Sequence, residues 1–167
     1  MIVGLVVALG ACSGSPVVTA PAVTATPPSP SVAAAATPLS PSTPGDFQGF
    51  AKRVVAAVDR LNAISAAHQT STNPTEAVAW AADLDAFAVA ELGWLAANPP
   101  AVCYQAAHEA LTKEYEALRK YAPLLSQFGL DPSQANVDAM QKELAADAVL
   151  TAAAERAFQS SIAACAN

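Results

Sequence analysis

The feature that most constrains this fold is the uneven distribution of charged and aromatic residues along the chain. Every Asp, Glu, Lys, Arg, Phe, Tyr and Trp lies between Asp46 and Asn167, whereas most of the 13 prolines precede Asp46. Residues 13–45 are dominated by Pro, Ala, Thr, Ser and Val. Such a segment buries too little apolar surface to offset the entropy that folding removes. We therefore expect a disordered Pro/Ala/Thr-rich tether before one folded domain at 46–167, which is a normal size for a single core.

The folded part is rich in Ala, the best helix former, and lacks the alternating pattern that is typical of strands. Apolar residues recur at spacings of three and four in four segments, which predicts four amphipathic helices. The predicted inward positions are Phe47, Phe50, Val54, Val58, Leu61 and Ile64 in the first; Trp80, Leu84, Phe87, Glu91 and Trp94 in the second; Tyr104, His108, Leu111, Tyr115 and Leu118 in the third; and Val137, Met140, Leu144, Ala148, Phe158 and Ile162 in the fourth.

Capping residues mark the starts of the first two helices. Asp46 is a candidate N-cap of the first helix. The sequence Asn73-Pro74-Thr75-Glu76 supplies an N-cap, a proline at the first helical position and a glutamate at the third. The second helix is expected to stop before Pro99-Pro100.

Prolines also set the predicted limits of the other two helices. The third helix is expected to begin at Pro100, and Pro123 should end or kink it, so residues 124–130 are predicted to form a short helical turn or loop. Asp131-Pro132 repeats the cap-and-proline start, and the fourth helix should run to about Ala164. Because the connections are short, consecutive helices should be antiparallel. The fold class predicted is therefore all-α, a four-helix up-down-up-down bundle.

The N-terminal residues have the features of a secretory signal. The apolar run from Ile2 ends in Leu9-Gly10-Ala11-Cys12 and is shorter than the ~20 apolar residues that span a bilayer. This ending resembles the lipobox of bacterial lipoproteins, in which the Cys receives a diacylglyceryl group and becomes the new N-terminus. The resemblance implies a signal peptide at 1–11, a lipidated Cys12 that starts a linker at 12–45, and an extracytoplasmic protein held on the cell membrane by its lipid.

The alternative is that Cys12 is an accidental cysteine in an uncleaved hydrophobic N-terminus. One feature departs from the lipoprotein pattern, because no Lys or Arg precedes the apolar run, whereas signal peptides begin with basic residues. We therefore expect Met1 to be an internal methionine and the true start codon to lie upstream.

The cysteine count provides an independent check. Three cysteines are an odd number for an exported protein. Lipidation of Cys12 would leave Cys103 and Cys165 as a pair, and an oxidising compartment favours a disulfide between them. In an up-down-up-down bundle the start of the third helix and the end of the fourth lie at the same end. The predicted topology therefore brings Cys103 and Cys165 together.

Two polar residues, Glu91 and His108, interrupt otherwise apolar stripes at similar heights on the second and third helices. If they face each other, they are candidates for a ligand or metal position or an acid/base pair, with Tyr104 and Trp94 as further ligand-binding candidates. The alternative is a partly solvated hydrogen-bonded pair that only joins two helices. The runs Lys113-Glu114 and Arg119-Lys120 are interpreted as a solvated helix face.

Several chemistries lack their sequence signatures. Neither paired Glu-x-x-His motifs nor Cys-x-x-Cys occur, so no metal is expected. Haem is disfavoured because His68 and His108 are too far apart to bind one iron, although Tyr104 and Tyr115 are possible ligands. Ser-x-x-Lys and Gly-x-Ser-x-Gly are also absent. We therefore expect neither an enzyme nor a cofactor.

The net charge of −6 argues against a nucleic-acid partner. The function expected is that of a lipid-anchored, non-enzymatic binding or accessory module at the cell envelope, with the membrane as one partner and an envelope protein as another. The alternative is a small-ligand-binding lipoprotein that uses the bundle core near Glu91 and His108.

Overall fold

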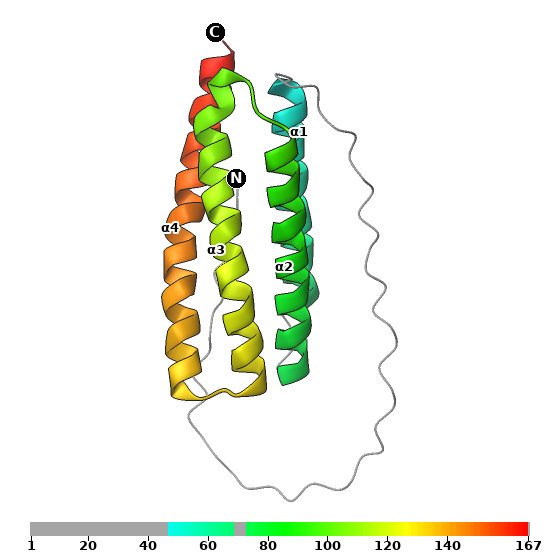
Figure 1. Ribbon diagram of the computed structural model, residues 1–167, viewed down its shortest axis with the longest axis vertical. Helices are drawn as coiled ribbons and strands as arrows, with labels where there is room; N and C mark the ends of the chain where they lie inside the picture. The colour runs from blue at the N-terminus through cyan, green and yellow to red at the C-terminus, as the bar shows by residue number, and fades with distance from the viewer. Residues whose placement is uncertain (1–46, 69–72, 167) are drawn as a thin grey trace, which may run out of the picture. The chain divides into compact units, whose positions relative to one another are not determined.

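The computed structural model describes residues 47–68 and 73–166. These ranges form α1 (Phe47–His68), α2 (Pro74–Ala97), the short 3-10 helix η1 (Val102–Tyr104), α3 (Gln105–Leu130) and α4 (Gln134–Cys165). Consecutive helices run antiparallel, which confirms the predicted all-α, up-down-up-down bundle (Figure 1). The predicted signal peptide, Cys12, the tether and the Asp46 cap lie outside the described residues.

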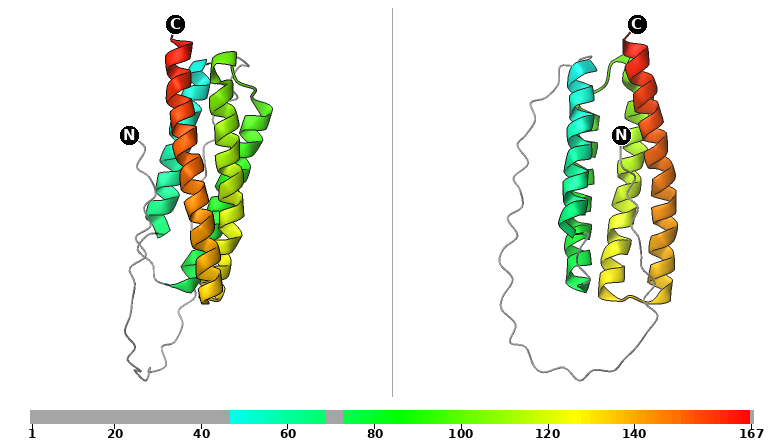
Figure 2. Two further views of the ribbon diagram at one scale, coloured as in Figure 1. Left: turned by 90° about the vertical axis from the view of Figure 1, so that its left-hand side faces the viewer. Right: turned by 180° about the vertical axis from the view of Figure 1, so that it is seen from behind.

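The helix α3 lies at the centre of the packing, because it contacts both α2 and α4, while α1 packs on α2 (Figure 2). Leu84 and Ala88 of α2 and Ala107 of α3 are completely buried in this core. Small alanine side chains let helices approach closely, but each buries little apolar area. Within residues 47–68 and 73–166, no helix is both long and apolar enough to cross a membrane.

At the end of the bundle where α1 begins, large aromatic side chains compensate for the small apolar area that the alanines bury. Phe50 of α1 lies 4.9 Å from Tyr104 of η1 and 5.8 Å from Trp94 of α2, measured between ring centroids. Tyr104 in turn stacks on Phe158 of α4 at 6.0 Å. Aromatic pairs of this kind contribute about 0.5–1.5 kcal/mol each beyond the area they bury. This cluster joins α1, α2, η1 and α4.

The same end carries the predicted disulfide. Cys103 of η1 is bonded to Cys165, the last residue of α4, with the two Cα atoms 5.4 Å apart. The pair closes a loop of 62 positions and fixes the end of α4 beside the start of α3. The prediction from cysteine count and helix direction is confirmed in the structure.

The predicted start and end of the second helix are also confirmed. Asn73 caps α2, its Oδ1 accepting a hydrogen bond from the Thr75 amide at 3.0 Å, and Pro74 is the first helical residue. At the other end, α2 stops at Ala97, and the Asn98 amide donates to the Leu95 carbonyl. Both ends of α2 are formed by hydrogen bonds between residues that are close together in the sequence.

The predicted limits of the third helix are wrong. It begins at Gln105, after η1, and continues through Pro123 to Leu130, so residues 124–130 are helical rather than a separate turn or loop. Pro123 itself is exposed, whereas Ala122 and Leu125 are buried. Packing on both sides of the proline therefore outweighs the loss of one backbone hydrogen bond.

Asp131 does not cap the fourth helix as predicted. It terminates α3, its amide bonded to the Gln127 carbonyl, and α4 starts only at Gln134 with Ser133 as the N-cap residue. The Asn136 side chain donates to both the carbonyl and the carboxylate of Asp131. The Asp131 carboxylate is thereby used to close the α3–α4 turn.

Two of the predicted inward positions of α4 are exposed. Ala148 and Ile162 face away from the core, because α4 packs on α3 and η1. The buried stripe of α4 is correspondingly narrow and comprises Met140, Ala154, Phe158 and Ser161.

Candidate functional site

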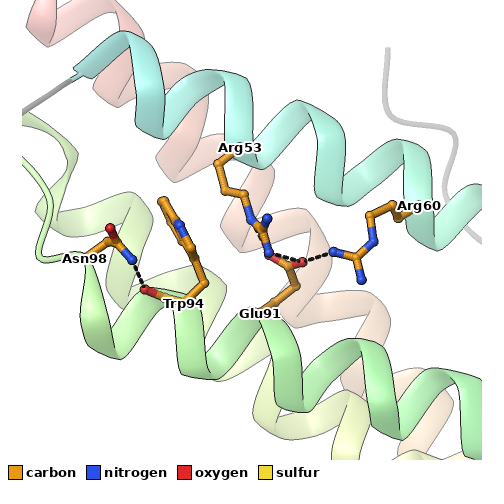
Figure 3. A network of polar contacts seen from close by, with 5 residues as sticks. All are labelled: Arg53, Arg60, Glu91, Trp94 and Asn98. Carbon is orange, nitrogen blue, oxygen red and sulfur yellow. Dashed lines mark hydrogen bonds and ion pairs between the residues drawn. The ribbon is translucent and has the colours of Figure 1, made fainter. Parts of the chain in front are cut away.

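A buried glutamate lies at the centre of the seam between α1 and α2. Glu91 is almost fully enclosed, with 2% of its side chain exposed. Its Oε2 accepts from Arg53 Nε at 3.0 Å, and its Oε1 accepts from Arg53 Nη2 and from Arg60 Nη1, each at 2.7 Å (Figure 3). One carboxylate thus joins two arginines of the neighbouring helix.

Helical periodicity explains why both arginines reach the same carboxylate. Arg53 and Arg60 are separated by about two turns of α1, so they project from one face of that helix. Glu91 enters between them from the inward stripe of α2, on the side that also carries Trp94 (Figure 3). Arg53, Arg60 and Glu91 therefore meet when these faces of α1 and α2 pack together.

Aromatic rings hold both guanidinium groups in place. The Arg53 guanidinium carbon lies 5.3 Å from the centroid of Trp94, and that of Arg60 lies 5.4 Å from the centroid of Phe87. Cation–π contacts of this kind contribute ~0.5–2 kcal/mol and restrict the orientation of the guanidinium plane. Beyond Trp94, the Asn98 side chain donates to the Trp94 carbonyl at 2.8 Å and closes the last turn of α2 (Figure 3).

The electrostatics of the cluster extend to Tyr115 on α3. Burial raises the pKa of the Tyr115 phenol well above its usual value of 10; Glu114 and Glu91 raise it further, while Arg53 and Arg60 act in the opposite direction. The phenol is therefore neutral at any physiological pH.

Burying an isolated carboxylate would cost free energy, and the two guanidinium groups offset that cost for Glu91.

The expected pairing of Glu91 with His108 is wrong. His108 uses Nε2 to contact the Leu95 carbonyl at 3.0 Å, and its ring lies 6.4 Å from that of Phe50. Glu91 is bound by the arginines of α1 instead. The partners of Glu91 lie on the first helix and not on the third.

The other two candidates, Trp94 and Tyr104, have different surroundings. Trp94 contacts Arg53 and belongs to the Glu91 cluster. Tyr104 is buried between Phe50 and Phe158, and burial raises the pKa of its phenol above 10. Arg53 and Arg60 were missed as site residues. One sequence pattern could have identified them. The two arginines lie about two turns apart on one helix, and the next helix carries a glutamate in its apolar stripe.

A second polar cluster joins the C-terminal end of α1 to the N-terminal part of α2. His68 has 8% of its side chain exposed, with Nδ1 2.7 Å from Glu76 Oε1 and Nε2 2.9 Å from Asp83 Oδ2. The ring also stacks on Trp80 at 6.2 Å. This arrangement satisfies His68 completely and ties the end of α1 to the first turns of α2.

The predicted solvated face of the third helix needs one correction. Lys113, Arg119 and Lys120 are exposed, but Glu114 turns toward α4 and is hydrogen-bonded to Thr151. Burial raises the pKa of Glu114 to about 7, and the nearby Asp147 carboxylate raises it as well.

Asp147 lies in the same α3–α4 seam. Burial and the charge of Glu143 raise the Asp147 pKa to about 6, and its Oδ1 has no hydrogen-bond partner within the described part of the chain. Burial, together with the negative charge of Asp147, raises the pKa of Tyr121 to about 12. Burial in this seam therefore raises the pKa of both carboxyl groups, Glu114 and Asp147.

Across the described ranges, no three His, Cys, Asp or Glu side chains converge in a way that would hold a metal ion. The Glu91 cluster offers two guanidinium groups, each placed over one aromatic ring. Guanidinium N–H groups are suited to binding oxyanions. No protein-family model, curated protein or solved structure matches this chain.

Proposed function

We propose that this chain is a lipid-anchored extracytoplasmic protein of the bacterial cell envelope, and that its helical domain is a non-enzymatic binding or accessory module. The observation that supports this best is the Cys103–Cys165 disulfide. Disulfides persist in oxidising compartments, outside the cytosol. The bond also leaves Cys12 as the one remaining cysteine of the three, and it directly follows Leu9-Gly10-Ala11.

The placement of the polar groups favours binding over catalysis. Glu91 is engaged by Arg53 and Arg60, and His68 is engaged by two carboxylates. Ion pairs of this kind fix the positions of the side chains around them. An activated nucleophile, in contrast, needs an adjacent base that is free to take its proton. The domain is accordingly proposed to recognise an envelope protein or a small ligand.

Lipidation at Cys12 tests the anchor. The chain, expressed in a bacterium, should incorporate a fatty-acid analogue and stay in the membrane fraction after a high-salt wash. Cys12→Ala should lose the label and appear in the soluble extracytoplasmic fraction, because a single missing lipid removes the hydrophobic attachment. The double variant Cys103→Ala/Cys165→Ala is the control and should keep both label and membrane association. A Cys12→Ala protein that remains membrane-bound contradicts the proposal.

Small-ligand binding near Glu91 is a second candidate, favoured by one specific observation. Two arginines share a single buried carboxylate, so the cluster keeps an excess of positive charge. Native mass spectrometry of the intact protein would report a bound ligand directly. A co-purified anion supports this role, whereas a mass equal to that of the bare chain with its lipid contradicts it.

A further inference from the structure

The Glu91 cluster is electrostatically incomplete. Among the described residues, Glu91 is the carboxylate that Arg53 and Arg60 bind, so two cations face one anion. The exposed fraction of the side chain rises outward from 2% for Glu91 to 12% for Arg53 and 32% for Arg60. Partial burial of an unbalanced guanidinium is unfavourable, and a second anion would relieve it.

Hydrogen-bond donors in the cluster also exceed the acceptors. A guanidinium carries five N–H groups. Within the described ranges, Arg60 donates through Nη1, and Arg53 donates through Nε and Nη2. The Trp94 indole N–H, on the ring that Arg53 covers, is buried and has no acceptor among the residues that the structure describes. The cluster therefore presents unused donors, of which those of Arg60 lie nearest to solvent.

The donors are already positioned for a ligand. Glu91 fixes one edge of each guanidinium, while Trp94 and Phe87 fix the planes. A planar fork that is held in place loses little conformational entropy when it binds a carboxylate or phosphate group. Such pre-organisation distinguishes Arg60 from Arg119, which is half exposed and touches Asp85 at 3.3 Å.

We propose that the α1–α2 seam binds the carboxylate or phosphate group of a small soluble molecule, through the outward N–H groups of Arg60 assisted by Arg53. Glu91 acts as a positioning residue that aims both arginines and does not touch the ligand. The net charge of −6 disfavours polyanions, so the anion we propose is a compact one. This inference adds a ligand class to the proposed binding role and is independent of the lipid on Cys12.

Arginine NMR signals test the proposal directly. The full chain, isotopically labelled, is titrated with sodium phosphate and, separately, with sodium acetate, while sodium chloride keeps the ionic strength constant. The Nε–Hε signals of Arg60 and Arg53 should shift along a saturating curve with at least one of the two anions, and that of Arg119 should not. Which anion saturates assigns the ligand to the phosphate or the carboxylate class.

Variants separate a built site from general salt effects. Arg60→Gln should weaken binding at least about tenfold, because a charge-assisted hydrogen bond is lost. Arg60→Lys keeps the charge without the fork and should bind with intermediate affinity. Arg119→Gln is the matched control and should bind as the unmodified chain does. Shifts that rise linearly with salt, or an Arg60→Gln protein that binds as tightly as the control, overturn the proposal and leave the proposed lipid anchor untouched.

Discussion

Arg53 and Glu91 form a two-pronged ion pair across the α1–α2 seam, with Nε 3.0 Å from Oε2 and Nη2 2.7 Å from Oε1. Both side chains are largely removed from water, at 12% and 2% exposure. Paired hydrogen bonds of this geometry impose direction as well as attraction. The pair therefore sets the register of α1 on α2, together with the His68 contacts at the other end of α1.

Replacing Arg53 should destabilise the domain strongly. Arg53→Met keeps the length of the side chain but leaves Glu91 buried with Arg60 as its remaining partner, so we expect a loss of about 3 kcal/mol in the free energy of unfolding. The control is Arg119→Met, which removes an ion pair whose members are about half exposed and should cost less than ~1 kcal/mol. Urea denaturation followed by circular dichroism measures both. Equal losses in the two variants would contradict the structural role assigned to Arg53.

The α3–α4 seam should make stability depend on pH. Burial raises the pKa of Glu114 from 4.5 to about 7, so between these values the folded protein binds more protons than the unfolded chain. Stability is then highest below pH 4.5 with respect to this group, falls as the pH rises to about 7, and levels off above it. The full effect of Glu114 amounts to roughly 3 kcal/mol. Asp147 adds a change of the same sign between 3.8 and about 6.

Glu114→Gln tests this dependence, because the amide cannot ionise. The variant should lose much of the decline between pH 5 and pH 8 that the unmodified chain shows in urea midpoints. Glu116→Gln is a matched control two positions along α3, where the side chain is exposed, and its pH profile should follow that of the unmodified chain. Parallel profiles for Glu114→Gln and Glu116→Gln would show that Glu114 is not the responsible group.

Features of the fold that depend on neighbours in the chain can be predicted from the sequence. The Asn73-Pro74 start of α2 is formed locally, by the hydrogen bond from the Thr75 amide to the Asn73 side chain. Asp131-Pro132 carries the same local pattern, yet Asp131 ends α3 and accepts hydrogen bonds from Asn136. The difference arises because the helix α3 continues through the exposed Pro123, which packing along its buried face allows.

The site was harder to predict, because its partners come from different helices. Arg53 lies on a helix whose long charged side chains would ordinarily point into water, and nothing local shows that it turns toward Glu91. Glu114 illustrates the same problem, since its neighbour Lys113 is exposed and only the contact with α4 removes Glu114 from water. The disulfide was predictable because the cysteine count and the helix directions both point to a pairing of Cys103 with Cys165.

Removal of the disulfide should weaken the domain without changing its fold. The Cys103–Cys165 bond spans 62 positions, and loops of this length give a stabilisation within the usual ~2–5 kcal/mol. Cys103→Ala/Cys165→Ala should therefore lower the urea midpoint while the far-ultraviolet circular dichroism remains helical. Peptide mapping without reductant should recover the two cysteines in one cross-linked fragment. Free thiols at both positions in exported protein would contradict the pairing.

Deletion of residues 16–44 should leave the melting temperature of the domain unchanged. The prediction rests on composition, since the segment has no charged or aromatic residue and is rich in proline, and it therefore has little with which to build a core. The aromatic residues that join the helices, such as Phe50 and Phe158, all lie beyond it. Calorimetry on the deleted and full chains measures the difference. A drop of several degrees would show that the segment packs on the bundle and that the domain begins before Asp46.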